Sequence, residues 1–284
     1  MSLNIVVLAK QVPDTRNVGK DAMKADGTVN RAALPAIYNP EDLNALEQAL
    51  RLKDLHEGST VTILTMGPAR AAEIIRESMF RGADGGCLLS GKEFAGSDTL
   101  ATSYALAQAI KKMENVDLII CGRQAIDGDT AQVGPQVAEK LGIPQITYAE
   151  EIIGIENNAV TVKRRLERGT ELVKGNMPMV VTVNGSAPDC RPRHAHLTLK
   201  YKNAKTPSEA GDTQNLDKPY LNIAEWSVND IEHDPQWLGL SGSPTKVKQI
   251  ENVVFTAKES KRMTPADAEI DALMKELIQN HTIG

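Results

Sequence analysis

The sequence predicts an α/β protein in which a parallel sheet is flanked by helices and followed by a short β-hairpin and an extended C-terminal arm that ends in a helix. Short apolar runs alternate with capped helices over residues 1–145, which is the pattern of βαβ units around a parallel sheet. Beyond that point the period changes to two residues, and from Gly185 to Pro219 the chain is polar. We therefore expect one α/β domain over residues 1–185 and an appended region over residues 186–284.

Five short apolar runs are expected to form the strands of the sheet. They are residues 3–9, 61–66, 87–89, 117–121 and 177–184. Runs of this length with turn residues on both sides are typical of parallel strands that are buried on both faces. Between residues 158 and 175 apolar and polar side chains alternate, which predicts a hairpin.

Cap and breaker residues place the helices between these strands. Residues 39–42 (Asn-Pro-Glu-Asp) combine an Asn cap, a Pro at the first helical position and acids in the first turn, so a helix is expected to begin there. Gly58 is expected to end it. Further helices are expected to begin at Gly67-Pro68 and at Ser97-Asp98-Thr99, and a fourth to end at Gly142.

The last expected helix begins near Thr264-Pro265. It has an apolar stripe made of Ile270, Leu273, Met274, Leu277 and Ile278. A helix that follows a polar arm must bury such a stripe, either against its own chain or against a partner subunit. The sequence favours neither possibility over the other.

Composition narrows the class of function. Aromatic residues make up only 4% of the chain and the net charge is -5, so binding to nucleic acid or to an anionic membrane is not expected. No apolar stretch approaches the roughly 20 residues of a membrane span. The three cysteines, Cys87, Cys121 and Cys190, are widely spaced, which suits a reducing cytoplasm rather than a disulfide framework.

The most informative stretch is CGRQAIDGDTAQVGPQVAEKLGIP, residues 121–144. It follows an apolar strand, passes through a Gly- and Asp-rich turn and continues as a helix. Such a turn can hold a phosphate on the free amides of residues 130–132, aided by the helix dipole, while Gly128 and Gly134 allow close approach of the backbone. The alternative is structural, because Asp129 and Gln132 also fit a capping box.

Competing motifs are weaker. Residues 86–92 resemble the start of a P-loop, but Glu93 stands where Mg²⁺ needs Ser or Thr. Cys190, His194 and His196 supply three metal ligands without an evident fourth, so no metal site is expected. No hydrolytic triad is evident, and the acidic pair Glu150-Glu151 is expected in a polar turn. The sequence thus predicts a nucleotide-binding protein without a catalytic residue of its own.

Four stretches together resemble the β subunit of electron-transfer flavoproteins. They are AKQVPDT (9–15), NPEDLNALEQAL (39–50), GRQAIDGDTAQVGPQVAEKLGIP (122–144) and MVVTVN (179–184), and the resemblance runs from residue 3 to about residue 255. It implies an adenine-nucleotide hydrolase-like α/β fold in a cytoplasmic heterodimer whose α subunit carries FAD. Residues 1–185 would then bind nucleotide, and residues 186–284 would supply a partner-docking loop, an arm and a helix that packs on the α subunit.

The resemblance also implies the cofactor-binding residues. They are Ala9, Lys10, Val12, Pro13, Asn39, Pro40, Glu41, Asp42, Met66, Thr99, Thr102, Cys121, Gly122, Arg123, Asp127, Gly128, Asp129, Thr130, Ala131, Gln132, Val133 and Gly134. Arg123 is expected either to donate to a flavin or to pair with Asp127 or Asp129. Leu197 matches the leucine with which the family docks dehydrogenases, although the residues around it differ.

The turn DGDTAQVGP (127–135) and the segment FAGSDTLATSYALA (94–107) look like the electron-bifurcating branch of the family. In that branch the β subunit holds a second FAD, which takes a hydride from NADH. One electron goes to the α-subunit FAD and a flavin-dependent dehydrogenase, and the other goes to ferredoxin or flavodoxin. Two alternatives remain open: a non-bifurcating β subunit with structural AMP that docks an acyl-CoA dehydrogenase, and a stand-alone nucleotide-hydrolysing enzyme.

Overall fold

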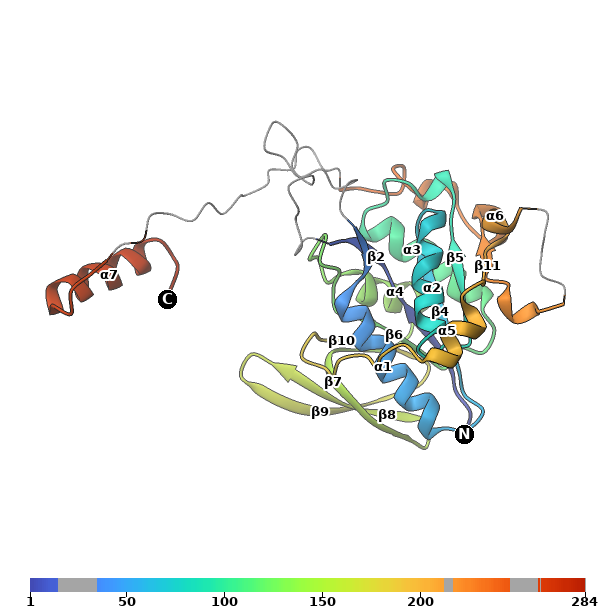
Figure 1. Ribbon diagram of the computed structural model, residues 1–284, viewed down its shortest axis with the longest axis horizontal. Helices are drawn as coiled ribbons and strands as arrows, with labels where there is room; N and C mark the ends of the chain where they lie inside the picture. The colour runs from blue at the N-terminus through green and yellow to red at the C-terminus, as the bar shows by residue number, and fades with distance from the viewer. Residues whose placement is uncertain (15–34, 212–216, 246–259, 261, 284) are drawn as a thin grey trace. The chain divides into compact units, whose positions relative to one another are not determined.

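The computed structural model describes residues 1–14, 35–211, 217–245, 260 and 262–283. Its main feature is a nine-stranded sheet with the order β11-β5-β4-β1-β6-β10-β7-β8-β9 (Figure 1). The strands are β1 Asn4–Leu8, β4 Thr60–Met66, β5 Gly85–Leu89, β6 Leu118–Gly122, β7 Gln145–Glu156, β8 Ala159–Leu166, β9 Gly169–Asn176, β10 Met179–Val183 and β11 Ala224–Trp226. Strands β2 (Gln11–Pro13) and β3 (Ala36–Tyr38) form a separate antiparallel pair.

The sheet is parallel from β11 to β7, and only the pairs β7–β8 and β8–β9 are antiparallel. This confirms the expected α/β class and the expected hairpin. The helices are α1 Pro40–Leu55, α2 Ala72–Met79, α3 Thr99–Lys112, α4 Val133–Leu141, α5 Ala195–Tyr201, α6 Pro207–Ala210 and α7 Asp267–Gln279.

Helices cover both faces of the sheet, and successive side chains of each strand point to opposite faces. In β1, Ile5 and Val7 belong to the apolar cluster under α1 and α2, whereas Val6 and Leu8 belong to the cluster under α3 and α4. Strands that are buried on both faces need apolar residues at every position. This requirement is why the short runs were recognisable in the sequence.

Strand β7 corrects one expectation. Glu150 and Glu151 lie within this 12-residue strand, not in a polar turn. The register of β7 against β8 shifts between Ala149 and Glu151 and again between Ile152 and Gly154. Such bulges break the two-residue alternation on which recognition of a strand depends. Glu150 is paired there with Lys163 and Arg165 of β8.

The polar region after residue 185 packs more closely than its composition suggests. Strand β11 extends the sheet beside β5, and Tyr201, Ala204, Leu221 and Ile223 enter the core. The chain divides into the compact units Met1–Lys248 and Gln249–Gly284, so the first unit extends well beyond residue 185. A few buried apolar side chains without periodicity attach this largely exposed segment to the core, and no sequence pattern marks them.

The second unit contains α7. Ile270, Met274 and Ile278 of its apolar stripe are exposed there. No helix among the described residues has the length and apolar character needed to span a membrane.

Candidate nucleotide-binding site

A cavity of about 380 Å³ lies beyond the carboxyl ends of β1, β4 and β6. After β1 the chain continues to α1 on one face of the sheet, and after β6 it continues to α4 on the other. Two neighbouring strands whose connections leave in opposite directions form the crevice in which open α/β sheets bind ligands. The volume lies within the ~300–1,000 Å³ typical of small-molecule pockets.

Most of the expected cofactor-binding residues line this cavity. Those that do are Ala9, Lys10, Asp42, Met66, Thr99, Thr102, Cys121, Gly122, Arg123, Asp127, Gly128, Asp129, Thr130, Ala131, Gln132, Val133 and Gly134. The cavity wall does not include Val12, Pro13, Asn39, Pro40 or Glu41. Nine residues that were not among the expected cofactor-binding residues also line it: Leu8, Leu64, Phe94, Gly96, Ser97, Asp98, Leu106, Gln124 and Ala125.

The first turn of α1 holds the loop after β6 from behind. Asn39 Nδ2 donates to the carbonyl of Gln124 at 2.9 Å, and Asn39 Oδ1 accepts from the amide of Ile126 at 3.2 Å. Glu41 accepts from the amide of Gln124 at 2.9 Å. Asn39 occupies the N-cap position of α1 but makes no side-chain capping bond, because its amide group is engaged with the loop.

Asp42 joins the ends of two strands. Its Oδ2 accepts from the amide of Lys10 and its Oδ1 from the amide of Gly122, both at 2.9 Å. Burial raises the pKa of Asp42 to about 7 despite these two hydrogen bonds. A Cβ at Gly122 would lie 2.5 Å from Asp42 Oδ1, so only glycine allows this approach.

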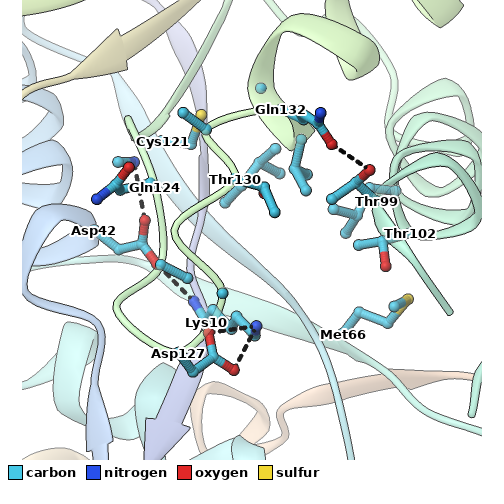
Figure 2. Close-up of a pocket in the computed structure, with 18 of the residues that line it drawn as sticks. Lys10, Asp42, Met66, Thr99, Thr102, Cys121, Gln124, Asp127, Thr130 and Gln132 are labelled. Atoms are coloured by element: carbon cyan, nitrogen blue, oxygen red, sulfur yellow. Dashed lines mark hydrogen bonds and ion pairs between the residues drawn. The ribbon is translucent and has the colours of Figure 1, made fainter. Parts of the chain in front are cut away.

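The turn before α4 is irregular. Asp129 and Ala131 have φ of 51° and 54°, and α4 begins at Val133 without a side-chain cap. The expected capping box is therefore wrong, because Asp129 accepts from Gln124 Nε2. Gln132 instead accepts from Thr99 Oγ1 (Figure 2). Turns that mix left- and right-handed residues can direct their amides toward an anion.

The two glycines of this segment differ in their surroundings. At Gly134 a Cβ would lie 2.6 Å from Thr182 Cγ2 and 2.9 Å from Cys121 Sγ, which confirms the expected close approach of α4 to the sheet. At Gly128 a Cβ would meet no atom within 4 Å. Gly128 thus borders the cavity itself.

The charged side chains of the cavity form separate pairs. Lys10 Nζ lies 2.8 Å from both carboxylate oxygens of Asp127 (Figure 2). Arg123 pairs with Glu41 at 3.1 Å and lies over the ring of Tyr148. The expected pairing of Arg123 with Asp127 or Asp129 is therefore wrong, since the first turn of α1 brings Glu41 closer.

The start of α3 forms the opposite wall. Asp98 caps this helix as expected, with Oδ1 accepting from the amides of Leu100 and Ala101. Burial works against the charge of Asp98, but hydrogen bonds from the amides of Ala101, Thr245 and Leu100 hold its pKa below the ordinary value. Thr99 and Thr102 then line the cavity one turn apart.

Leu197 lies in α5 and packs partly against the core, whereas its neighbour Leu199 is 66% exposed. No cluster of three or more potential metal ligands occurs within the described part of the chain. Burial raises the pKa of the Cys190 thiol to about 12.

Residues 26–216 match a family model described as the electron transfer flavoprotein domain. The chain belongs to the electron transfer flavoprotein family. It is 45% identical over 254 residues to the electron transfer flavoprotein subunit beta of Megasphaera elsdenii, with 87% of each chain covered. It is 43% identical over 293 residues to the acryloyl-CoA reductase electron transfer subunit gamma of Anaerotignum propionicum, covering 99% of this chain and 100% of that one.

A third relative is subunit CarD of the caffeyl-CoA reductase-Etf complex of Acetobacterium woodii, 43% identical over 245 residues with 86% of each chain covered. The chain is thus an electron-transfer protein of the β-subunit type. Subunits of this type pair with an α subunit and serve redox enzymes.

Proposed function

We propose that this chain is the β subunit of a cytoplasmic, electron-bifurcating electron-transfer flavoprotein and that its cavity holds the nucleotide part of an FAD. The observation that carries the proposal is the cavity between the ends of β1 and β6 with the irregular turn at its edge. Bound FAD would supply hydride acceptance from NADH and one-electron transfer to the α-subunit FAD and to ferredoxin or flavodoxin.

The residues fit a dinucleotide. Leu8, Leu64, Met66, Phe94 and Leu106 give the cavity apolar walls, which suit an adenine ring. The amides at the start of α4 suit a phosphate, and the hydroxyls of Thr99 and Thr102 add donors on the facing wall. The protein's own part is to bind, orient and shield the cofactor.

The resemblance of residues 127–135 and 94–107 to the bifurcating branch supports FAD rather than AMP. The names of two relatives refer to acryloyl-CoA reductase and to caffeyl-CoA reductase. We infer from them that the partner dehydrogenase reduces a CoA thioester.

Residues 186–284 are proposed to carry the contacts with partners. The exposed side chains Ile270, Met274 and Ile278 of α7 would pack on the α subunit. Leu197 would contribute to the docking of the dehydrogenase.

The deciding experiment counts the nucleotides. The chain is purified with its α subunit, the cofactors are released with acid, and FAD and AMP are measured per heterodimer. Two FAD and no AMP support the proposal, and NADH-driven reduction of ferredoxin is then expected. One FAD and one AMP contradict it and identify a β subunit with a structural nucleotide.

The alternative of a different class is a nucleotide-hydrolysing enzyme. A colourless monomer that turned over ATP would support it. Against it stands the segment after β1, where Ala9 and Lys10 lead directly into β2 and leave no Ser-Gly-Gly phosphate loop.

A further inference from the structure

The cavity has an unfavourable charge balance for an anionic ligand. Four aspartates line it, Asp42, Asp98, Asp127 and Asp129, against two cations, Lys10 and Arg123. A nucleotide phosphate can bind there only if the carboxylates are held by other groups of the protein, because like charges at short range repel strongly in a partly buried site.

Three of the four aspartates are held by neutral donors. Asp42 accepts from two backbone amides that belong to the loops after β1 and β6. Asp98 accepts from amides in the first turn of α3. Asp129 accepts from the side-chain amide of Gln124. None of these three carboxylates takes a cation away from a ligand.

Asp127 is held differently. Both of its oxygens lie 2.8 Å from Lys10 Nζ, and within the described residues no other side chain pairs with it. The second cation of the cavity, Arg123, is engaged by Glu41 and by the ring of Tyr148. Lys10 is therefore the cation that a phosphate can recruit.

The position of this ion pair favours an exchange of partners. It spans the crevice from the end of β1 to the turn before α4, which is where the sheet topology directs a ligand. The Lys10 side chain is 50% exposed and that of Asp127 only 21%. The amide of Lys10 is fixed by Asp42, so the ammonium group can move while the backbone stays in place.

We propose that Asp127 and a phosphate of the nucleotide compete for the ammonium group of Lys10. Lys10 is then a phosphate-binding residue, and Asp127 weakens binding by holding Lys10 when no phosphate is present. This inference rests on the proposed nucleotide site, but it holds equally for FAD and for AMP.

The test is a double-mutant cycle on the heterodimer freed of its nucleotide. AMP is the probe, because it is one candidate cofactor and also forms part of the other, FAD. Binding is measured by calorimetry. Asp127→Asn is expected to tighten AMP binding about fivefold, the upper range for releasing an exposed ion pair. Lys10→Met is expected to weaken binding about tenfold, the size expected for one hydrogen bond to a charged group. Lys10→Arg keeps the positive charge and is expected to stay within about threefold of wild type.

The decisive comparison is Asp127→Asn in the Lys10→Met background, where the tightening is expected to disappear. Asp129→Asn is the matched control, because Asp129 lies in the same turn but bonds to the neutral Gln124. Its effect is expected to be the same with and without Lys10. Circular dichroism of each variant verifies that it is folded.

Three outcomes would overturn the inference. Weaker binding by Asp127→Asn would mean that Asp127 itself contacts the ligand. Equal tightening with and without Lys10 would mean simple charge repulsion. A wild-type heterodimer that bound neither AMP nor FAD would refute the proposed nucleotide site, and this inference with it.

Discussion

The turn of residues 127–132 and the first turn of α1 both contact residues 122–126 of the loop that follows β6, and they contribute to the site in different ways. The turn of residues 127–132 faces the cavity, and a Cβ added at Gly128 in this turn would meet no atom within 4 Å. The first turn of α1 supports the loop after β6: Asn39 and Glu41 lie outside the cavity wall, Asp42 also lines it, and all three side chains bond to residues 122–126 or to Lys10. We infer that changes in the turn of residues 127–132 affect mainly ligand binding, whereas changes in the first turn of α1 affect the stability of the fold as well.

The sharpest test of this contrast changes Gly122, which packs against the first turn of α1, and Gly128, which lies in the turn that faces the cavity. Gly122→Val is expected to destabilise the protein by about 3 kcal/mol, because its side chain would collide with the carboxylate and backbone of Asp42. Gly128→Val is expected to leave the free energy of unfolding within ~0.5 kcal/mol of wild type while expelling the nucleotide. Urea unfolding without nucleotide and acid extraction of cofactor separate the two effects. Equal loss of stability in both variants would refute this contrast.

Asp42 should make the protein's free energy of unfolding depend on pH. Its pKa is about 7 in the folded protein against 3.8 ordinarily, so between these values the folded state binds more protons than the unfolded state. Its contribution to stability therefore falls as the pH rises from about 4 to about 7 and is constant above. Asp42→Asn should remove this slope, as measured by the wild-type-minus-variant difference in urea midpoint. If the difference in urea midpoint between wild type and variant did not change between about pH 4 and pH 7, the pKa of Asp42 would not be raised in the folded protein.

A smaller effect on stability is expected from the side-chain amide of Asn39, which lies at the N-cap position of α1 and bonds to the loop after β6. Asn39→Ala deletes two hydrogen bonds to the backbone of Gln124 and Ile126, which should cost about 2 kcal/mol of stability. Asn39→Asp keeps an acceptor for Ile126 but sets a carboxylate oxygen against the carbonyl of Gln124 at a fully buried position, so it should be no more stable than Asn39→Ala. If Asn39→Ala lowered nucleotide affinity without a loss of stability, Asn39 would act on ligand binding, as the turn of residues 127–132 does, and not on the fold.

The smallest effect is expected from the turn itself. Ala131 has φ of 54°, a conformation that costs a residue with a Cβ about 1 kcal/mol. Ala131→Gly removes this strain but adds freedom to the unfolded chain, so stability should rise by no more than about 0.5 kcal/mol. A loss above ~1 kcal/mol in thermal unfolding would show that the Ala131 methyl group packs in the turn.

Much of the site could be read from the chain because its segments are local. The strand before Gly122, the turn at residues 127–132 and the cap at Asp98 are each specified by neighbouring residues. In the segment 94–107 only Thr99 and Thr102 were expected at the site, and the wall formed by Phe94, Gly96 and Leu106 was not, because these three residues match ordinary loop and helix patterns. Their place in the cavity results from the pairing of β4 with β5 and the packing of α3.

The sequence by itself determined the α/β class, the hairpin and the strand–turn–helix at residues 118–141, because periodicity, caps and glycines act over short distances. The tertiary structure decided which polar residues face the cavity. Asn39 and Glu41 turn toward the loop after β6, Arg123 pairs with Glu41, and Lys10 reaches Asp127 across the crevice. These partners are 80 or more residues apart in the chain, and their contacts exist only once the parallel strands are in register.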